Sequence, residues 1–494
     1  MNNVIVLPLL IPLFTAVILI FFKEKITAQK WISALSGLLN MAVAGFIVYQ
    51  VRTEGIQTLN MSGWLPPFGI VFVVDMFAAL LVLTTTVVGI ACLFYAFRSI
   101  GEERERNYFY PFYHFLLTGV LGSFLTGDLF NLFVCFEVML IASYALIVLG
   151  GTKRQLRETL KYILINIVSS TLFVASVAYL YAAVGTLNMA HLSLRVAEVG
   201  QGGILTVIAI LFLIVFSLKA GLFLFFWLPG SYSAPPAAVT ALFGALLTKV
   251  GLYAIIRMFT LIFHHDSSFS HTSIGWMAAA TMLLGGLGAV AYSDINRILN
   301  YNVVVSVGFI AFGLAAATQD SLDGVVFYLM HDMVAKALMF FLGGMIIAAA
   351  GTSRLQEMGG LIKRYPWMGW MFFVTALTLV GVPPLSGFTG KLLIVRGGLD
   401  AQLYGLTALG LASSLIVLYS MMKIFMQAFW GEEKLNPDRP RTKVSGMGSA
   451  AAGMFIVMIL LGLGSEWVYS LVSQAGEGLF RPELYIEAVL KGVG

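Results

Sequence analysis

The sequence predicts an all-α polytopic membrane protein with about fourteen transmembrane helices, two inverted five-helix repeats and interrupted helices. Composition is the first observation behind this prediction. Of the 494 residues, 59% are hydrophobic and only 11% are charged, and the mean hydropathy of +0.92 lies outside the range of soluble domains. The second and third observations are the succession of apolar runs and an internal repeat.

Apolar runs long enough to cross a bilayer of about 30 Å follow one another along the chain. The fourth and fifth runs are the most closely spaced and divide at Gly127-Asp128. Residues 188–199, between the sixth and seventh runs, are predicted to form either an amphipathic helix at the outer interface or an ordinary connecting loop. The predicted spans are 3–22, 31–50, 71–97, 110–127, 129–150, 161–184, 204–229, 236–263, 273–293, 299–318, 322–350, 366–396, 402–430 and 447–472.

Lysine and arginine residues gather in alternate loops. The even-numbered loops carry little beyond Arg52 and Arg195. Because cytoplasmic loops are the ones enriched in lysine and arginine, we predict a multi-pass protein of the cell membrane with both termini outside. The basic residues of the odd-numbered loops are Lys23, Lys25, Lys30, Arg98, Arg104, Arg106, Lys153, Arg154, Arg157, Arg297, Arg354, Lys363, Arg364, Lys434, Arg439, Arg441 and Lys443.

The chain also repeats itself at an offset of 166 residues, which matches Asp128 to Asp294 and Tyr162 to Tyr328. The matches extend over three pairs of predicted helices. Each copy contains an odd number of helices, so the two copies cross the membrane in opposite senses, which is typical of secondary transporters. The predicted organisation is 1–109 for the first three helices, 110–263 for the first repeat, 273–430 for the second repeat, and 431–494 for the last helix and a tail.

Two opposite charges lie inside apolar runs of the predicted first repeat. Glu137 lies in LFNLFVCFEVMLIASYALIVL, which contains no cation, and Lys219 lies in VFSLKAGLFLFF. A lysine at the centre of a membrane helix costs about 2.5–3.5 kcal/mol on insertion scales. A carboxylate at the same depth either stays protonated or pairs with a cation. We therefore predict that Glu137 and Lys219 pair, either as a working pair or as a static ion pair.

A second buried lysine, Lys249, shares a helical stripe with Tyr253 and Arg257, because residues four apart lie on one face of a helix. Arg257 lies in the inner or the outer third of the predicted span, where its long side chain is able to snorkel toward the interface. Lys249 is too central for that. Asp75 is expected to begin a helix at the interface.

The eleventh predicted span contains YLMHDMVAKALMFF, which includes His331, Asp332 and Lys336. Asp332 and Lys336 are four residues apart and can pair on one helix face. His331 and Lys336 are five apart, about 140° around a regular helix, so they do not share a stripe. Imidazole changes charge near neutral pH. We therefore predict that His331 takes part in proton transfer rather than in packing alone.

The twelfth predicted span is interrupted at GVPPLSGFTGK. Pro383-Pro384 and the glycines that follow cannot continue a regular helix. Lys391 is then expected in the first turn of the second half-helix, where the positive end of the helix dipole disfavours its charge. This predicts a lysine that exchanges protons. At the offset of the repeat, Lys219 aligns with Leu385 rather than with Lys391.

Patterns typical of enzymes and cofactor sites are absent from the sequence, including phosphate-binding glycine loops, hydrolase triads, and haem and iron–sulfur motifs. The histidines within 264–271 cluster in an outer loop but lack the spacing of metal ligands. Cys92 and Cys135 lie in apolar segments without a CxxC pattern and are expected to be packed thiols. We therefore expect no catalytic residue, no metal and no cofactor.

Four stretches together resemble the antiporter-like subunits shared by Mrp cation/proton antiporters and respiratory complex I. They are FVCFEVMLIASYALIVL, SLKAGLFLFFWLPGSYSAPPAAV, LLTKVGLYAIIR and GVPPLSGFTGK, and the likeness covers nearly the whole chain. The resemblance implies fourteen helices, inverted five-helix repeats and a chain of buried charges along the membrane midplane. It also implies that Glu137 and Lys219 are the proton-modulating pair, Lys249 and His331 the central connection, and Lys391 the terminal lysine.

The same resemblance implies a function. The chain is expected to be the proton-translocating subunit of a multisubunit Na⁺/H⁺ antiporter, with other Mrp subunits, protons and Na⁺ as partners and no nucleic acid. The stretch GVPPLSGFTGKLLIVRGGL looks most like the D-type subunits, and Lys336 fits that assignment. The alternative is a proton-pumping antiporter-like subunit of complex I. A purely structural scaffold is disfavoured by the buried Glu, Lys and His residues.

Overall fold

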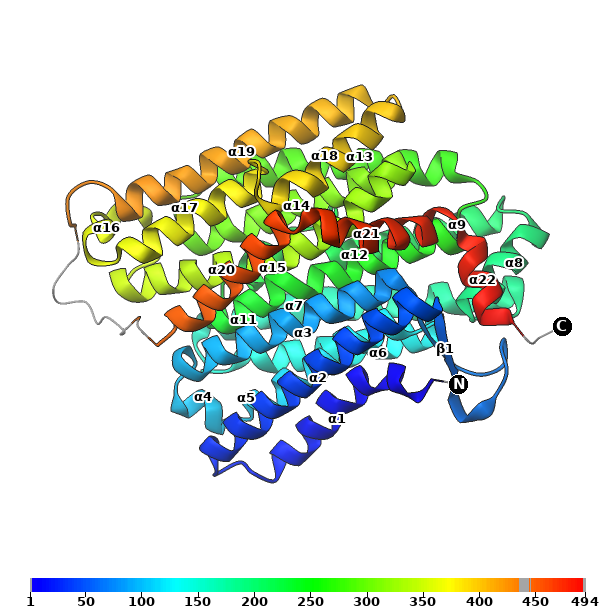
Figure 1. Ribbon diagram of the computed structural model, residues 1–494, viewed down its shortest axis with the longest axis horizontal. Helices are drawn as coiled ribbons and strands as arrows, with labels where there is room; N and C mark the ends of the chain where they lie inside the picture. Colours follow the sequence, from blue (N-terminus) through cyan, green and yellow to red (C-terminus); the bar gives the residue numbers. More distant parts are fainter. Residues whose placement is uncertain (1, 435–443, 445, 492–494) are drawn as a thin grey trace.

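The computed structural model describes residues 2–434, 444 and 446–491 and shows a bundle of long helices lying side by side (Figure 1). Among the described residues, ten helices are long and apolar enough to cross a membrane, and a bent helix pair and three shorter apolar helices accompany them. Each predicted span overlaps one of these helices. The all-α polytopic class is therefore confirmed, while the exact number of crossings stays a prediction. Arg439, Arg441 and Lys443, counted above among the loop charges, lie outside the described residues.

The elements follow the chain in three groups. The first comprises η1 (Asn3–Val6), α1 (Leu7–Ile20), α2 (Ile26–Glu54), β1 (Gln57–Asn60), η2 (Met61–Gly63), β2 (Val71–Val74), α3 (Met76–Ser99) and α4 (Glu102–Arg106). The second comprises α5 (Phe109–Leu125), α6 (Leu129–Val148), α7 (Lys153–Val184), α8 (Met189–Val199), α9 (Ile204–Ala220), α10 (Leu228–Ser231), α11 (Ala237–Leu242), the π-helix η3 (Phe243–Leu247), α12 (Thr248–Arg257) and the π-helix η4 (Met258–Ile262). The third comprises α13 (Ser267–Ala291), α14 (Ile295–Ala316), α15 (Gln319–Ala350), η5 (Leu355–Glu357), α16 (Leu361–Arg364), α17 (Pro366–Val380), α18 (Ser386–Asp400), α19 (Tyr404–Phe429), α20 (Gly448–Leu463), α21 (Ser465–Phe480) and α22 (Pro482–Leu490).

The start of the predicted third span, residues 71–74, is a strand and not helix. The sequence VFVV is rich in β-branched residues, which favour strands, and β2 pairs antiparallel with β1. Asp75 then begins α3, because its side chain accepts a hydrogen bond from the backbone N–H of Ala78 at 2.9 Å and so caps the helix. Residues 188–199, for which a helix and a loop were equally open, form the helix α8 with Asn188 as its cap.

Three predicted spans are broken in the structure. Helix α9 ends at Ala220 and is capped by Gly221 (φ +75°), and α17 ends at Val380 and is capped by Gly381 (φ +92°). A Cβ atom at Gly381 would lie 2.9 Å from Cδ of Lys391, so both the left-handed backbone and the close approach require glycine there. The last predicted span is the pair α20 and α21, bent by 78°, and it is followed by α22, which the sequence did not predict.

Local structure recurs at the 166-residue offset. Helices α7 and α15 are both 32 residues long. Each begins at a threonine with a capping box, Thr152 or Thr318, and each ends at a left-handed glycine, Gly185 or Gly351. These correspondences support the repeat, and the opposite membrane sense of the two copies stays a prediction. The same offset relates the isolated antiparallel bridges Asp128–Asn188 and Asp294–Arg354.

The two ends of the described chain lie on the same side of the bundle. In Figure 1, β1, α8 and α22 lie at one end, and α4 and α16 lie at the other. The N-terminal η1 and the C-terminal α22 both contact β1. Helices α4 and α16 belong to the basic loops that the charge pattern places in the cytoplasm. The structure therefore agrees with termini that share one side, and which side faces outward stays a prediction.

Helix α15 is the central element of the bundle. It contacts α3, α11, α14, α17, α18, α20 and α21, and almost its whole length is buried. Its charged residues therefore lie where several interrupted helices meet. Cys92 and Cys135 are buried free thiols elsewhere in the bundle, as predicted.

Candidate functional site

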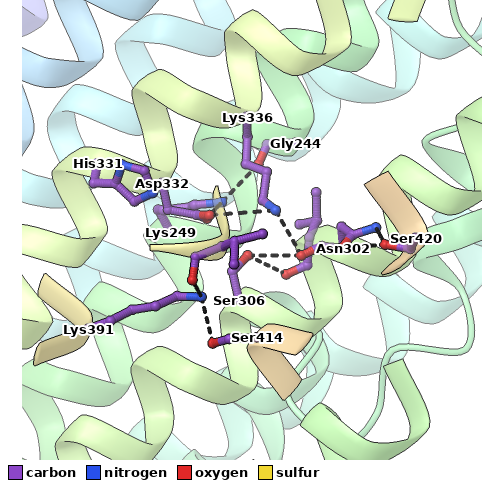
Figure 2. A network of polar contacts seen from close by, with 12 residues as sticks. Gly244, Lys249, Asn302, Ser306, His331, Asp332, Lys336, Lys391, Ser414 and Ser420 are labelled. Atoms are coloured by element: carbon purple, nitrogen blue, oxygen red, sulfur yellow. Dashed lines mark hydrogen bonds and ion pairs between the residues drawn. The ribbon is translucent and has the colours of Figure 1, made fainter. Parts of the chain in front are cut away.

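Three charged side chains meet in the interior of the bundle. The Nζ atom of Lys249 on α12 lies 2.7 Å from Oδ2 of Asp332 on α15. The Nζ atom of Lys336, one turn further along α15, lies 3.7 Å from Oδ1 of the same carboxylate. Figure 2 shows this carboxylate between the two ammonium groups. One buried carboxylate thus faces two lysine ammonium groups, and both contacts lie inside the bundle, where unpaired charge is costly.

Each of the two lysines also donates a hydrogen bond to a backbone carbonyl oxygen. Lys249 donates a hydrogen bond to the carbonyl oxygen of Gly244 at 2.9 Å, and Gly244 lies in the π-helix η3. Lys336 donates to the carbonyl oxygen of Asn302 on α14 at 2.9 Å. The Asn302 side chain in turn donates to Ser420 on α19 at 3.1 Å. Short π-helical segments are frequent at functional sites, and here one of them provides a carbonyl oxygen that Lys249 binds.

His331 is fully buried but lies apart from the Lys249–Asp332 pair. Figure 2 shows its ring directed away from that pair. Its Nδ1 atom is 2.9 Å from the hydroxyl of Ser386 at the start of α18, and its ring centroid is 5.3 Å from that of Tyr328. The structure therefore joins Lys249 to Asp332 directly and places His331 beside the break between α17 and α18.

Lys391 binds to the end of the preceding half-helix. Its Nζ atom donates to the carbonyl oxygen of Val380 at 3.0 Å and to the hydroxyl of Ser414 at 2.8 Å, and it lies 5.3 Å from the ring centroid of Phe309. The expectation that Lys391 occupies the first turn of the second half-helix is wrong, because α18 begins at Ser386. Val380 is the last residue of α17, and the negative end of a helix favours a cation.

Glu137 and Lys219 come close together through a third residue. Ser170 on α7 donates a short hydrogen bond to Oε1 of Glu137 on α6. Lys219, in the last turn of α9, donates to the Ser170 hydroxyl at 3.3 Å and lies 5.2 Å from the ring centroid of Phe136. The expected pair is thus bridged by a hydroxyl group and is not a direct ion pair. Like Lys391, Lys219 lies at the negative end of the first half of a broken helix.

Arg257 does not snorkel toward the interface. Its Nη2 atom lies 2.6 Å from Oδ1 of Asp75, and both side chains are buried. The guanidinium also lies 5.2 Å from the ring centroids of Phe77 and Tyr485. Tyr485 belongs to α22, so the C-terminal helix covers a position that the sequence placed near water. Asp75 and Arg257 therefore join α3 to α12 inside the protein.

The sequence reasoning missed the uncharged polar residues of the site. Serine, threonine and asparagine are common in membrane helices, and nothing local marks the few that contact a lysine. The repeat offers one signal, because Ser170 matches Lys336 at the 166-residue offset. The missed residues that contact the predicted ones are Ser170, Asn302, Ser386 and Ser414.

These features define a class of protein. Charged residues inside a membrane bundle are costly, and they mark pathways for ions and protons when they face the interior and meet at broken helices. The family described as NADH:quinone oxidoreductase/Mrp antiporter, TM, matches residues 126–425. The chain belongs to this family.

Individual relatives agree over the full length of the chain. The D-type subunit of the Na(+)/H(+) antiporter of Bacillus subtilis (strain 168) is 54% identical over 492 residues, which cover 99% of this chain and 100% of the relative. A chain in the structure of the Mrp complex from Dietzia sp. DQ12-45-1b has a TM-score of 0.92 at 29% identity, over 99% of this chain and 100% of that one. A chain of respiratory complex I from Thermus thermophilus has a TM-score of 0.83 at 22% identity, over 97% of this chain and 99% of that one. This likeness shows a common fold alone. The resemblance predicted from the sequence is confirmed.

Proposed function

We propose that this chain is the D-type subunit of an Mrp-type Na⁺/H⁺ antiporter, assembled with other subunits in the cell membrane, and that it carries the proton side of the exchange. It acts as part of a secondary transporter. The observation that carries the proposal is the shared carboxylate of Asp332, held between the buried side chains of Lys249 and Lys336. The likeness to the antiporter subunit of Bacillus subtilis over the whole chain supports the choice of complex.

The proposed pathway has three stations. The first is Glu137 with Lys219, bridged by the hydroxyl of Ser170, which can both donate and accept a hydrogen bond. The second is the cluster around Asp332. The third contains His331 and Lys391, each of which contacts a serine hydroxyl. Protons pass between the stations through side chains and water, and a charge gained at one station changes the proton affinity of the next.

The partner subunits distinguish the two candidate complexes. The chain carries an affinity tag, and the complex is purified from membranes of a strain that expresses the native operon. We expect antiporter subunits to co-purify, and everted vesicles that contain the complex to move protons when Na⁺ is added. Co-purification of redox subunits with quinone reductase activity would instead favour the alternative, a proton-pumping subunit of complex I.

A further inference from the structure

A cavity of about 540 Å³ opens between α7, α10 and α14, outside the row of buried charges. Its basic lining residues are Arg157, Lys161 and Arg297. The start of α7 lies at the same end of the bundle as α4, because a Cβ atom at Gly150 would lie 2.9 Å from Nε of Arg104. The cavity therefore opens at the end of the bundle that carries the basic loops.

The lining carries more positive charge than its single carboxylate can compensate. Nη2 of Arg157 lies 2.7 Å from Oε1 of Glu158, and Nζ of Lys161 lies 3.4 Å from the same oxygen. The Glu158 side chain is buried, with 7% exposed, whereas those of Arg157 and Lys161 are 67% and 58% exposed. Arg297 approaches from α14 and lies 4.7 Å from the ring centroid of Tyr292. Three cations against one anion leave an attractive site for a further anion.

An exposed apolar stripe leads away from these cations along α7. Leu160 is 58% exposed, Leu164 56% and Val168 56%, and their spacing of four residues places them on one helix face. Leu164 also lines the cavity, together with Phe226, which is 68% exposed. A cationic cavity is thus continuous with an exposed apolar surface of α7.

We propose that this cavity binds the phosphate group of an anionic phospholipid, whose acyl chains lie along the apolar stripe of α7. Basic cavities between membrane helices at the cytoplasmic side are suited to lipid phosphate groups. Guanidinium groups are particularly suited to this role, because their planar donors match phosphate oxygens. A soluble anion would use the cations but not the stripe. The proposal adds a lipid site to the chain and does not depend on which residues carry protons.

The test uses the intact, purified antiporter complex after removal of bound lipid by detergent. Phosphatidylglycerol is titrated in, and its apparent affinity is measured from the rise in the midpoint of thermal unfolding, with phosphatidylcholine as the neutral lipid. We expect Lys161→Gln and Arg297→Gln each to weaken the phosphatidylglycerol affinity about fivefold, the effect of one basic residue near an anionic headgroup. Lys161→Arg should retain the wild-type affinity.

Arg154→Gln is the matched control. Arg154 is exposed on the first turn of α7 but does not line the cavity, so this variant should bind phosphatidylglycerol as the wild type does. The proposal is overturned by unchanged affinity in both cavity variants, or by an equal loss in Arg154→Gln, which would indicate diffuse attraction. It is also overturned if inorganic phosphate gives the same stabilisation. If another subunit is lost when the cavity variants are purified, a protein covers the cavity, and the lipid proposal is overturned as well.

Discussion

Single residues in this site share one chemical feature, which is that each lysine reaches an uncharged oxygen. A hydroxyl or carbonyl oxygen stabilises the charged ammonium form of a lysine. When that lysine loses its proton, no buried anion is left without a partner, because the oxygen is uncharged. Only Lys249 and Lys336 also contact a carboxylate, and they share it. Such partners suit lysines that alternate between charged and neutral forms. The lysine–oxygen contacts are Lys219 to Ser170, Lys249 to Gly244, Lys336 to Asn302 and Lys391 to Ser414.

Replacement of Lys391 by arginine separates charge from proton exchange. Arginine keeps the cation but does not deprotonate in a protein. We expect Lys391→Arg to assemble normally and to lose Na⁺-dependent proton movement in everted vesicles as completely as Lys391→Ala. Exchange near the wild-type rate in the arginine variant would mean that a fixed charge suffices, and the proton-carrying role of Lys391 would be wrong.

The bridging hydroxyl of Ser170 gives a second prediction at this scale. Ser170→Ala removes the group that joins Glu137 to Lys219, so exchange activity should fall about 100-fold or more, the range for loss of one positioned proton-transfer group. Ser169→Ala is the control, because the neighbouring Ser169 hydroxyl donates only to the carbonyl oxygen of Val215. Equal activities of the two variants in the vesicle assay would remove Ser170 from the pathway.

The shared carboxylate of Asp332 gives a third prediction at the scale of single residues. Asp332→Asn leaves two buried cations without their anion, and breaking a buried ion pair in this way costs about 3–5 kcal/mol. We expect a lower midpoint of thermal unfolding in the purified complex, together with loss of exchange. Adding Lys249→Gln to Asp332→Asn should recover part of the stability but none of the activity. If the single variant is as stable as the wild type, the cluster is not ionised as described.

At the scale of elements, interrupted helices bring the lysines to equivalent places by different routes. Lys219 lies in the last turn of α9, whereas Lys391 lies in α18 and reaches back to Val380 at the end of α17. Both ammonium groups thus lie at the negative end of the first half of a broken helix. This explains how Lys219 and Lys391 correspond although the sequence repeat aligns Lys219 with Leu385.

The break after α17 makes Gly381 a test of this geometry. Gly381→Ala places a methyl group 2.9 Å from Cδ of Lys391 at a backbone φ of +92°, which costs about 1–2 kcal/mol in backbone strain alone. We expect the variant to assemble with reduced stability and to lose most exchange activity as Lys391 is displaced. Gly405→Ala, where the methyl group would meet no atom within 4 Å, should behave as the wild type. Normal exchange by Gly381→Ala would show that the position of Lys391 tolerates displacement.

At the scale of the whole molecule, α15 carries both the central cluster and contacts to helices of both predicted repeats. It packs against α11 of the predicted first repeat and against α17 and α18 of the predicted second repeat. Its charges therefore link the interrupted helix of the first repeat with that of the second. The structure also gathers the ends of the described chain on one side of the bundle, opposite the basic loops (Figure 1).

Cysteine labelling checks the orientation of the bundle. The native cysteines are buried, so background labelling should be low. We expect a membrane-impermeant maleimide to label Met61→Cys, at the end with β1, in intact cells. Lys153→Cys, at the start of α7, should react only after the cells are opened. Labelling of position 153 from outside would reverse the predicted topology.

The sequence by itself determined the membrane class, the approximate spans and the positions of the charged residues within those spans, and it predicted the repeat. Each of these depends on local composition or periodicity, because an apolar run must form a helix in lipid to satisfy its own backbone. A charge within such a run is therefore recognisable before its partner is known. Glu137, Lys219, Lys249, His331, Lys336 and Lys391 could all be named in this way.

Only the tertiary structure decided how these charges are partnered. Asp75 and Arg257 are 182 positions apart, and no local signal joins them or shows that α22 covers them. The bridging role of Ser170 and the contact of Lys391 with Val380 depend equally on how the helices pack. A one-residue rotation of a helix turns a side chain by about 100°, so contacts across the bundle are set by the packing of all the helices together and not by any single segment.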